Sequence, residues 1–238
     1  MRSLALALVL AATSADAREL TVYAASSLRE IFTDLGHELE ARTPGLTVRL
    51  NFAGSQELRT QIDHGAPADV FASADARHMA GLEVTPRGFA RNEPVVVVPR
   101  DNPAGIKSFA DLPKARRLVI GAAEVPIGAY TLQILDRAGR AFRDRVLARV
   151  VSRELNVRQV LAKVVLGEAD AAVVYRTDAR AAGDKVEVIA IPGELNVVAS
   201  YLVAALPGAG EPKLAQAFIE LLLAPDGQRR LAAAGFAP

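Results

Sequence analysis

Short apolar runs alternate with amphipathic helical patterns along most of this chain. The runs at residues 20–24, 94–99 and 171–175 are brief and largely apolar, as buried strands are. Residues 28–39 and 157–166 carry apolar side chains at the three- and four-residue spacing of one helix face. Repeated strand–helix units of this kind predict an α/β fold with mostly parallel sheets flanked by helices.

The chain has 238 residues, enough for two lobes of sheet and helix. We predict that residues 18–95 and 199–238 form the first lobe and residues 96–198 the second, with a ligand cleft between them. The last two helical patterns begin with Pro212 and Pro225, a residue suited to the first helical turn. These helices are expected to return to the first lobe.

The first 17 residues differ from the rest of the chain. Arg2 precedes an apolar stretch at residues 4–12, and Ala15-Asp16-Ala17 has the small-x-small pattern of a cleavage site. This is the pattern of a secretory signal peptide. The apolar stretch is shorter than the roughly 20 residues that span a bilayer. We therefore predict an exported, periplasmic protein that is cleaved near Ala17.

The overall composition excludes several classes of function. Lys and Arg total 28 and Asp and Glu total 27, so the net charge of +1 gives no reason to expect a nucleic-acid partner. The chain has no cysteine, which excludes disulfides, thiolate metal sites and thiol nucleophiles. The three histidines show no metal-binding spacing, and no nucleotide-binding or G-x-S-x-G motif is present. We predict a protein that is not an enzyme and uses no cofactor.

Small or polar residues stand where the predicted strands meet the predicted helices. Ser27 and Ser55 follow the first two strands, and Asn156-Val157 follows a later one. A further helix begins near Pro126. Helix N-termini offer unpaired N–H groups and a partial positive charge, and they gather at the carboxyl ends of strands in such sheets. The pattern therefore predicts that these junctions hold an anion.

Structural roles also explain these residues. Ser27 and Glu30 have the spacing of a capping box, and this pattern alone favours plain capping. Ser55 has the same alternative in weaker form, because the acidic residue is missing from the matching position. Asn156 is an equally good helix cap. Tyr175 is, by residue type, more often a half-buried aromatic side chain than a ligand contact.

Longer motifs add a family resemblance to these observations. The chain resembles the periplasmic molybdate-binding proteins of molybdate ABC importers over nearly its whole length, and more broadly the type II periplasmic binding proteins. That resemblance implies a two-lobed fold that closes on a tetrahedral oxyanion. The motifs that carry it are TVYAASSL (21–28), NFAGSQELRTQI (51–62), GAPADVFASAD (65–75), VPIGAY (125–130), NVRQVLAKVVLGEADAAVVYRTDA (156–179) and APDGQRRLAAAGFAP (224–238).

The resemblance also implies which residues hold the oxyanion. Matched motif by motif, the hydroxyl donors are Ser27, Ser55 and Tyr175, and the backbone N–H donors are Ile127 and Val157. Molybdenum would be bound only as the oxyanion, with no direct protein ligand to the metal.

The chain departs from the family pattern beside the third helix start. Ile127 stands where the family usually has alanine, and residues 122–124 (Ala-Ala-Glu) replace the usual Asp or Asn followed by Pro. These changes affect the expected path of the loop and the size of the pocket. Arg176 follows Tyr175 directly, and we expect its side chain to point outward, because a pocket of neutral donors needs no fixed cation.

The resemblance implies a binding protein that captures molybdate or tungstate and delivers it to an inner-membrane ABC permease. We expect a monomer. One alternative is a binding protein for another tetrahedral oxyanion such as sulfate. Another is an exported serine hydrolase that uses Ser55 or Ser27 with one of the three histidines. A sensor domain on the same fold is the last alternative.

Overall fold

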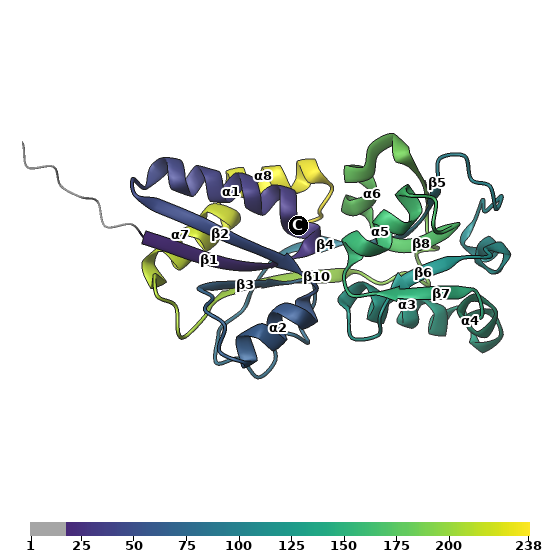
Figure 1. The fold of residues 1–238 in the computed structure, drawn as a ribbon, viewed down its shortest axis with the longest axis horizontal. Coiled ribbons are helices and arrows are strands. Elements are labelled where there is room, and N and C mark those ends of the chain that lie inside the picture. Colours follow the sequence, from purple (N-terminus) through teal and green to yellow (C-terminus); the bar gives the residue numbers. More distant parts are fainter. Residues whose placement is uncertain (1–17) are drawn as a thin grey trace, which may run out of the picture.

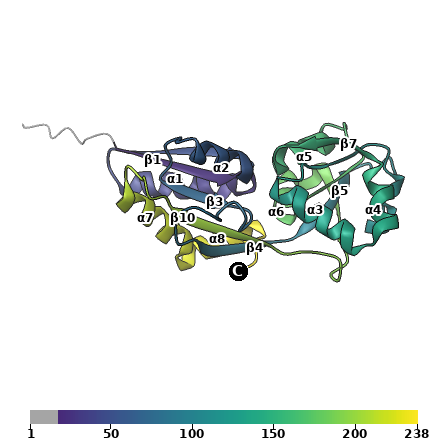
Figure 2. The ribbon, with the colours of Figure 1, turned by 90° about the horizontal axis from the view of Figure 1, so that it is seen from below.

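The computed structural model of the protein describes residues 18–238, and the predicted signal peptide at residues 1–17 lies outside the described residues. The described chain forms two lobes, each built on one five-stranded sheet (Figure 1). Figure 2 shows the lobes lying end to end and joined by narrow chain segments. The predicted two-lobed α/β fold is therefore confirmed.

The first lobe has the strand order β2-β1-β3-β10-β4. Side chains of β1 alternate between two cores: Leu20 and Val22 pack with the residues of α1 and α7, whereas Tyr23 packs with Leu58 of α2. The sheet is thus covered on both faces. The elements of this lobe are β1 (Arg18–Ala25), η1 (Ser26–Leu28), α1 (Arg29–Arg42), β2 (Leu46–Ala53), α2 (Ser55–Asp63), β3 (Val70–Ser73), β4 (Arg87–Asn92), β10 (Ala199–Ala205), α7 (Pro212–Leu223) and α8 (Pro225–Ala234).

The second lobe has the strand order β7-β6-β8-β5-β9. Its elements are β5 (Pro94–Pro99), η2 (Phe109–Lys114), β6 (Leu118–Gly121), α3 (Pro126–Arg137), α4 (Arg140–Leu147), β7 (Val150–Glu154), α5 (Val157–Val165), β8 (Ala171–Tyr175), α6 (Arg176–Ala182), η3 (Gly183–Lys185) and β9 (Val186–Ile189). The four valines of β5 are fully buried, as the continuous apolar run predicts. None of the helices within residues 18–238 is both long and apolar enough to cross a membrane.

The sheets are mixed, which corrects the expectation of mostly parallel pairing. β1 pairs in parallel with β2 and β3, and β6 pairs in parallel with β7 and β8. β10 and β5 are antiparallel to both of their neighbours. These two strands are the ones that enter a sheet directly from the other lobe, so they do not follow the strand–helix–strand crossover that makes neighbouring strands parallel.

The chain passes between the lobes twice. β4 ends at Asn92 in the first sheet and β5 begins at Pro94 in the second, while the return lies between β9 and β10. We propose that the lobe boundaries fall at these two passages, near the positions predicted from the sequence. α7 and α8 pack against α1, so the C-terminal helices return to the first lobe (Figure 1).

Candidate functional site

A small cavity lies at the junction of the lobes, where strands end and helices begin. Its free volume is about 10 Å³, roughly the room that one water molecule needs. All five sequence-predicted site residues line it, so the fold brings together positions that lie far apart in the chain. The lining residues are Ala25, Ser26, Ser27, Ala53, Gly54, Ser55, Ala74, Val125, Pro126, Ile127, Asn156, Val157 and Tyr175.

Ser55 is the first residue of α2 and is almost fully buried. Its Oγ accepts a hydrogen bond from the backbone N–H of Ala74 at 3.1 Å. A backbone N–H can only donate, so the hydroxyl hydrogen of Ser55 is free for another acceptor. The serine does not cap α2, because Gly54 occupies the N-cap position and Glu57 accepts from its N–H.

Ser27 lies in the middle of the single turn η1 and is also buried. Its Oγ lies 2.8 Å from the hydroxyl oxygen of Tyr201 on β10. The capping box predicted for Ser27 and Glu30 does not form. The α-helix begins later, at Arg29, with no side-chain cap, and the Glu30 carboxylate instead pairs with Arg158 of the second lobe at 2.6 Å.

Ile127 lies in the first turn of α3, where a backbone N–H has no acceptor within the helix. Its Cγ2 methyl lies 2.9 Å from the point where a Cβ of residue 121 would stand, and Gly121 has none. A Cβ at Gly128 would lie 1.9 Å from the carbonyl oxygen of Ala122. Two glycines therefore let α3 approach the end of β6 closely, and the larger Ile127 side chain is accommodated against Gly121.

Val157 is the first residue of α5, and its N–H likewise has no acceptor within that helix. The predicted cap is confirmed: Asn156 Oδ1 accepts from the N–H of Gln159 at 3.1 Å. The cap satisfies an N–H of the first turn and fixes the direction in which the chain enters α5. Across the junction of the lobes, α5 contacts η1, the turn that precedes α1 (Figure 1).

Tyr175 ends β8 and is only 1% exposed, so the expectation of a half-buried side chain is wrong. Its hydroxyl has no hydrogen-bond partner among the described residues. Burial, together with the neighbouring tyrosines and Asp178, raises the pKa of Tyr175 well above its ordinary value, so the hydroxyl keeps its proton. A buried hydroxyl without a partner is costly, and this one belongs to a residue that lines the cavity.

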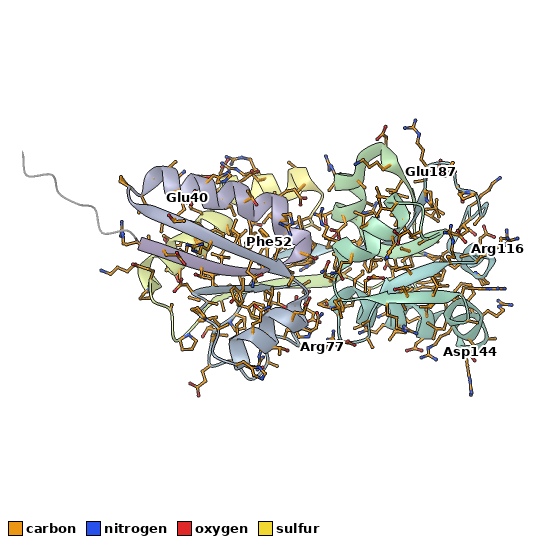
Figure 3. All side chains as sticks on the ribbon, viewed as in Figure 1. Glu40, Phe52, Arg77, Arg116, Asp144 and Glu187 are labelled. Atoms are coloured by element: carbon orange, nitrogen blue, oxygen red, sulfur yellow. The ribbon has the colours of Figure 1, made fainter. Side chains whose placement is uncertain are left out.

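The cavity carries no charged side chain among its described lining residues. Arg176, which follows Tyr175, instead pairs with Glu93 at 2.8 Å, and both side chains are about half exposed. Figure 3 shows charged side chains such as Arg116, Asp144 and Glu187 on the outer surface of the second lobe. No histidine lines the cavity in the described chain, so neither serine has a base there for hydrolase chemistry.

Direct contacts between the lobes surround the cavity. Gln56 Nε2 donates to the carbonyl oxygen of Leu155 at 2.7 Å, and the Tyr130 hydroxyl reaches the carbonyl oxygen of Ala74 at 3.4 Å. A Cβ at Gly54 would lie 2.3 Å from that same Leu155 oxygen. The absence of a side chain at position 54 therefore lets the two backbones meet at the rim.

Arg158 connects the rim to a buried carboxylate. Its Nε lies 2.7 Å from Oδ1 of Asp178, which is fully buried in α6. Burial raises the pKa of Asp178 to about 7, and the attraction of Arg158 offsets only part of that effect. Arg158 therefore holds Asp178 on its own lobe and Glu30 on the other.

Sequence analysis did not find Tyr201, Arg158 or Asp178. Tyr201 comes from a strand about 170 residues beyond Ser27, and its position beside that serine follows only from the sheet order. Arg158 and Asp178 lie within quoted motifs, at Asn-Val-Arg and Tyr-Arg-Thr-Asp. That proximity to predicted site residues was the signal that could have identified them.

Comparison with known proteins identifies the family of this chain. Residues 20–237 match the family described as bacterial extracellular solute-binding protein. The chain belongs to this family. Two curated relatives share the name molybdate-binding protein ModA, which confirms the predicted resemblance. The Mycobacterium tuberculosis relative is 41% identical over 228 residues, covering 93% of this chain and 85% of that protein. The Escherichia coli relative is 31% identical over 236 residues, covering 93% and 90%.

A solved structure has the same fold as this solute-binding protein. The periplasmic molybdate-binding protein of Azotobacter vinelandii aligns with a TM-score of 0.81 over 92% of this chain and 99% of that one. Its sequence identity is 21%. The agreement at this low identity confirms the fold.

Proposed function

We propose that this solute-binding protein captures molybdate or tungstate and delivers it to an ABC permease. The observation that carries the proposal is Tyr175, which lines the cavity and whose buried hydroxyl has no hydrogen-bond partner among the described residues. Two relatives that are more than 30% identical carry the name of molybdate-binding proteins, which supports the choice of ligand.

The proposed ligand contacts are donors only. The hydroxyls of Ser27, Ser55 and Tyr175 and the N–H groups of Ile127 and Val157 would surround the oxyanion. Each hydrogen bond to a charged group contributes about 1.5–3 kcal/mol. Five such bonds total about 7.5–15 kcal/mol, and the upper part of that range exceeds an association cost of roughly 4 kcal/mol by the approximately 8 kcal/mol that micromolar binding needs. Each donor replaces a water that the dianion loses on entering the cavity.

A site with donors and no acceptors favours a fully deprotonated oxyanion. A protonated phosphate would bring its own O–H group to a cavity that offers it no acceptor, and this would weaken its binding. Discrimination between molybdate or tungstate and the smaller sulfate ion would depend on the dimensions that the cavity adopts around the bound anion. Molybdate and tungstate are nearly equal in size, so the donor set does not rank one above the other.

The proposed cellular setting follows from the family and the N-terminal pattern. The protein would be exported, cleaved near Ala17 and active in the periplasm as a monomer. It would serve as a carrier without catalytic activity, cofactor or nucleic-acid partner, and its protein partner would be the inner-membrane permease.

Titration calorimetry of the purified protein with molybdate, tungstate and sulfate tests this function. We expect one site per chain, similar affinities for molybdate and tungstate, and much weaker binding of sulfate. Ligand at a thousandfold its dissociation constant should stabilise the protein by about 4 kcal/mol and raise its melting temperature. Failure to bind either metal oxyanion, or tighter binding of sulfate, would contradict the proposal.

A further inference from the structure

The two serines of the cavity differ in how their hydroxyl groups are held. For Ser55 the protein donor is the N–H of Ala74, so the direction of that hydrogen bond is fixed. For Ser27 the neighbour is another hydroxyl, Tyr201, at 2.8 Å, and either oxygen could carry the shared hydrogen. Only one of these two arrangements leaves a hydrogen of Ser27 for an anion.

The surroundings of Tyr201 decide between the two arrangements. Its side chain is 0% exposed, and burial raises its pKa far above the ordinary value, so the hydroxyl keeps its proton. Its ring packs edge-on against the rings of Phe89, Phe236 and Tyr175 at centroid distances of 6.1, 5.3 and 5.8 Å. The phenylalanine rings offer the Tyr201 hydrogen no conventional acceptor, and the Tyr175 hydroxyl forms no hydrogen bond with it.

A nearby amide adds a donor and not an acceptor. The side-chain NH₂ of Asn92 donates to Thr177 Oγ1 at 2.8 Å and also favours negative charge on the Tyr201 oxygen. The oxygen of the same amide accepts from the N–H of Glu93 at 3.0 Å. If Ser27 donated to Tyr201, the Tyr201 hydrogen would therefore have no acceptor within hydrogen-bond distance among the described residues. If Tyr201 donates to Ser27, the Tyr201 hydrogen is paired and the Ser27 hydrogen is left for an acceptor in the cavity.

We propose that Tyr201 is a positioning residue that donates to Ser27 Oγ and so directs the Ser27 hydrogen into the cavity. Tyr201 does not line the cavity, and its hydroxyl is hydrogen-bonded to Ser27, so this hydroxyl acts on the anion through Ser27. Both serines are then held in the same way: the hydroxyl oxygen accepts a hydrogen bond from a protein group, and the hydroxyl hydrogen is left for the ligand. This inference rests on the proposed oxyanion function.

A double-mutant cycle on the affinity for molybdate tests this role. The variants are Tyr201→Phe, Ser27→Ala and the double variant, and phenylalanine keeps the ring packing. Loss of the orienting hydrogen bond should weaken binding about threefold to tenfold in the Tyr201→Phe variant. In the Ser27→Ala background the same substitution should change affinity by less than about twofold, because the Ser27 hydroxyl that Tyr201 orients is already absent.

Tyr23→Phe is the matched control, because Tyr23 is a buried tyrosine on β1 that packs on the α2 side of the sheet, away from Ser27. It should leave the affinity unchanged in both backgrounds. Equal weakening by Tyr201→Phe in the wild-type and Ser27→Ala backgrounds, or no weakening in either, would overturn the positioning role alone. Failure of the wild-type protein to bind any tested oxyanion would instead overturn the proposed function and this inference together.

Discussion

The two walls of the cavity present their donors in different ways. The wall from the first lobe offers the hydroxyls of Ser27 and Ser55, and each oxygen lies within hydrogen-bond distance of a protein group. The wall from the second lobe offers the first-turn N–H groups of α3 and α5 and the unpartnered hydroxyl of Tyr175. The first wall is therefore held in place by contacts with protein, whereas the second holds donors that have no protein partner.

This difference separates residues that bind the ligand through their side chain from residues that bind it through their backbone. A hydroxyl disappears when its side chain is replaced, but a backbone N–H survives most substitutions. Molybdate binding by the first wall should therefore be sensitive to which side chains are present. Binding by most of the second wall should depend on where the helices α3 and α5 begin, because their N–H groups supply the donors.

The largest expected effect comes from Arg158, which contacts residues of both lobes. Arg158→Ala removes the partner of the buried Asp178 and the contact with Glu30, and it should lower the free energy of unfolding by about 3–5 kcal/mol. Urea unfolding would measure this loss. Arg176→Ala is the matched control, because its pair with Glu93 is half exposed and should contribute less than about 1 kcal/mol. Equal effects of the two substitutions would show that Arg158 has no special role.

The next effect is a pH dependence carried by Asp178. The pKa of Asp178 in the folded protein is about 7, above the value of about 3.9 in an unfolded chain. Folding therefore favours the protonated form, so the stability from this group is full below pH about 4 and is lost as the pH rises to about 7. The difference in unfolding free energy between wild type and Asp178→Asn should change by a few kcal/mol across this window. A constant difference would show that Asp178 does not titrate there.

Hydroxyl removal should distinguish the two walls by its effect on stability. Tyr175→Phe and Ser55→Ala should each weaken molybdate binding by about 1.5–3 kcal/mol, roughly 10- to 150-fold. Without ligand, however, Tyr175→Phe should keep or raise the unfolding free energy, because it removes a buried hydroxyl that has no partner. Ser55→Ala should lower it by about 1–3 kcal/mol, because the buried N–H of Ala74 loses its acceptor. Calorimetry and chemical unfolding measure the two quantities, and destabilisation by Tyr175→Phe would contradict the distinction.

The smallest effect on molybdate affinity is expected at Ile127. Ile127→Ala keeps the backbone N–H at the start of α3, so molybdate affinity should change by less than about threefold. The smaller side chain should still lower the unfolding free energy by about 2–5 kcal/mol, because Ile127 is almost fully buried. A loss of affinity comparable to that of Ser55→Ala would show that the Ile127 side chain shapes the cavity directly.

The sequence predicted the elements whose apolar patterns are strong. The spacing of Ile31, Phe32, Leu35 and Leu39 predicted α1, and all four are buried. β4 and α4 were missed because they bury few apolar side chains: α4 buries only Val146 and is otherwise rich in charge. The antiparallel direction of β5 and β10 was also missed, since an apolar run carries no information about the direction of its neighbours.

The same limit applies to the cavity. Local patterns and family motifs identified residues that the fold brings together, because helix starts can be recognised within a few residues of sequence. The partners that orient them could not be found this way. Tyr201 and the N–H of Ala74 reach the serines from separate strands, and the local pattern at Ser27 favoured a capping box that does not form.

A crystal structure of the protein with bound molybdate would test the central claim most directly. The account predicts that the oxyanion lies between the lobes, with its oxygens about 2.7–3.2 Å from hydroxyl and backbone N–H donors of both walls. Ser27, Ser55 and Tyr175 should each contribute one hydroxyl. An anion bound elsewhere, or held mainly by arginine or lysine side chains, would contradict the account.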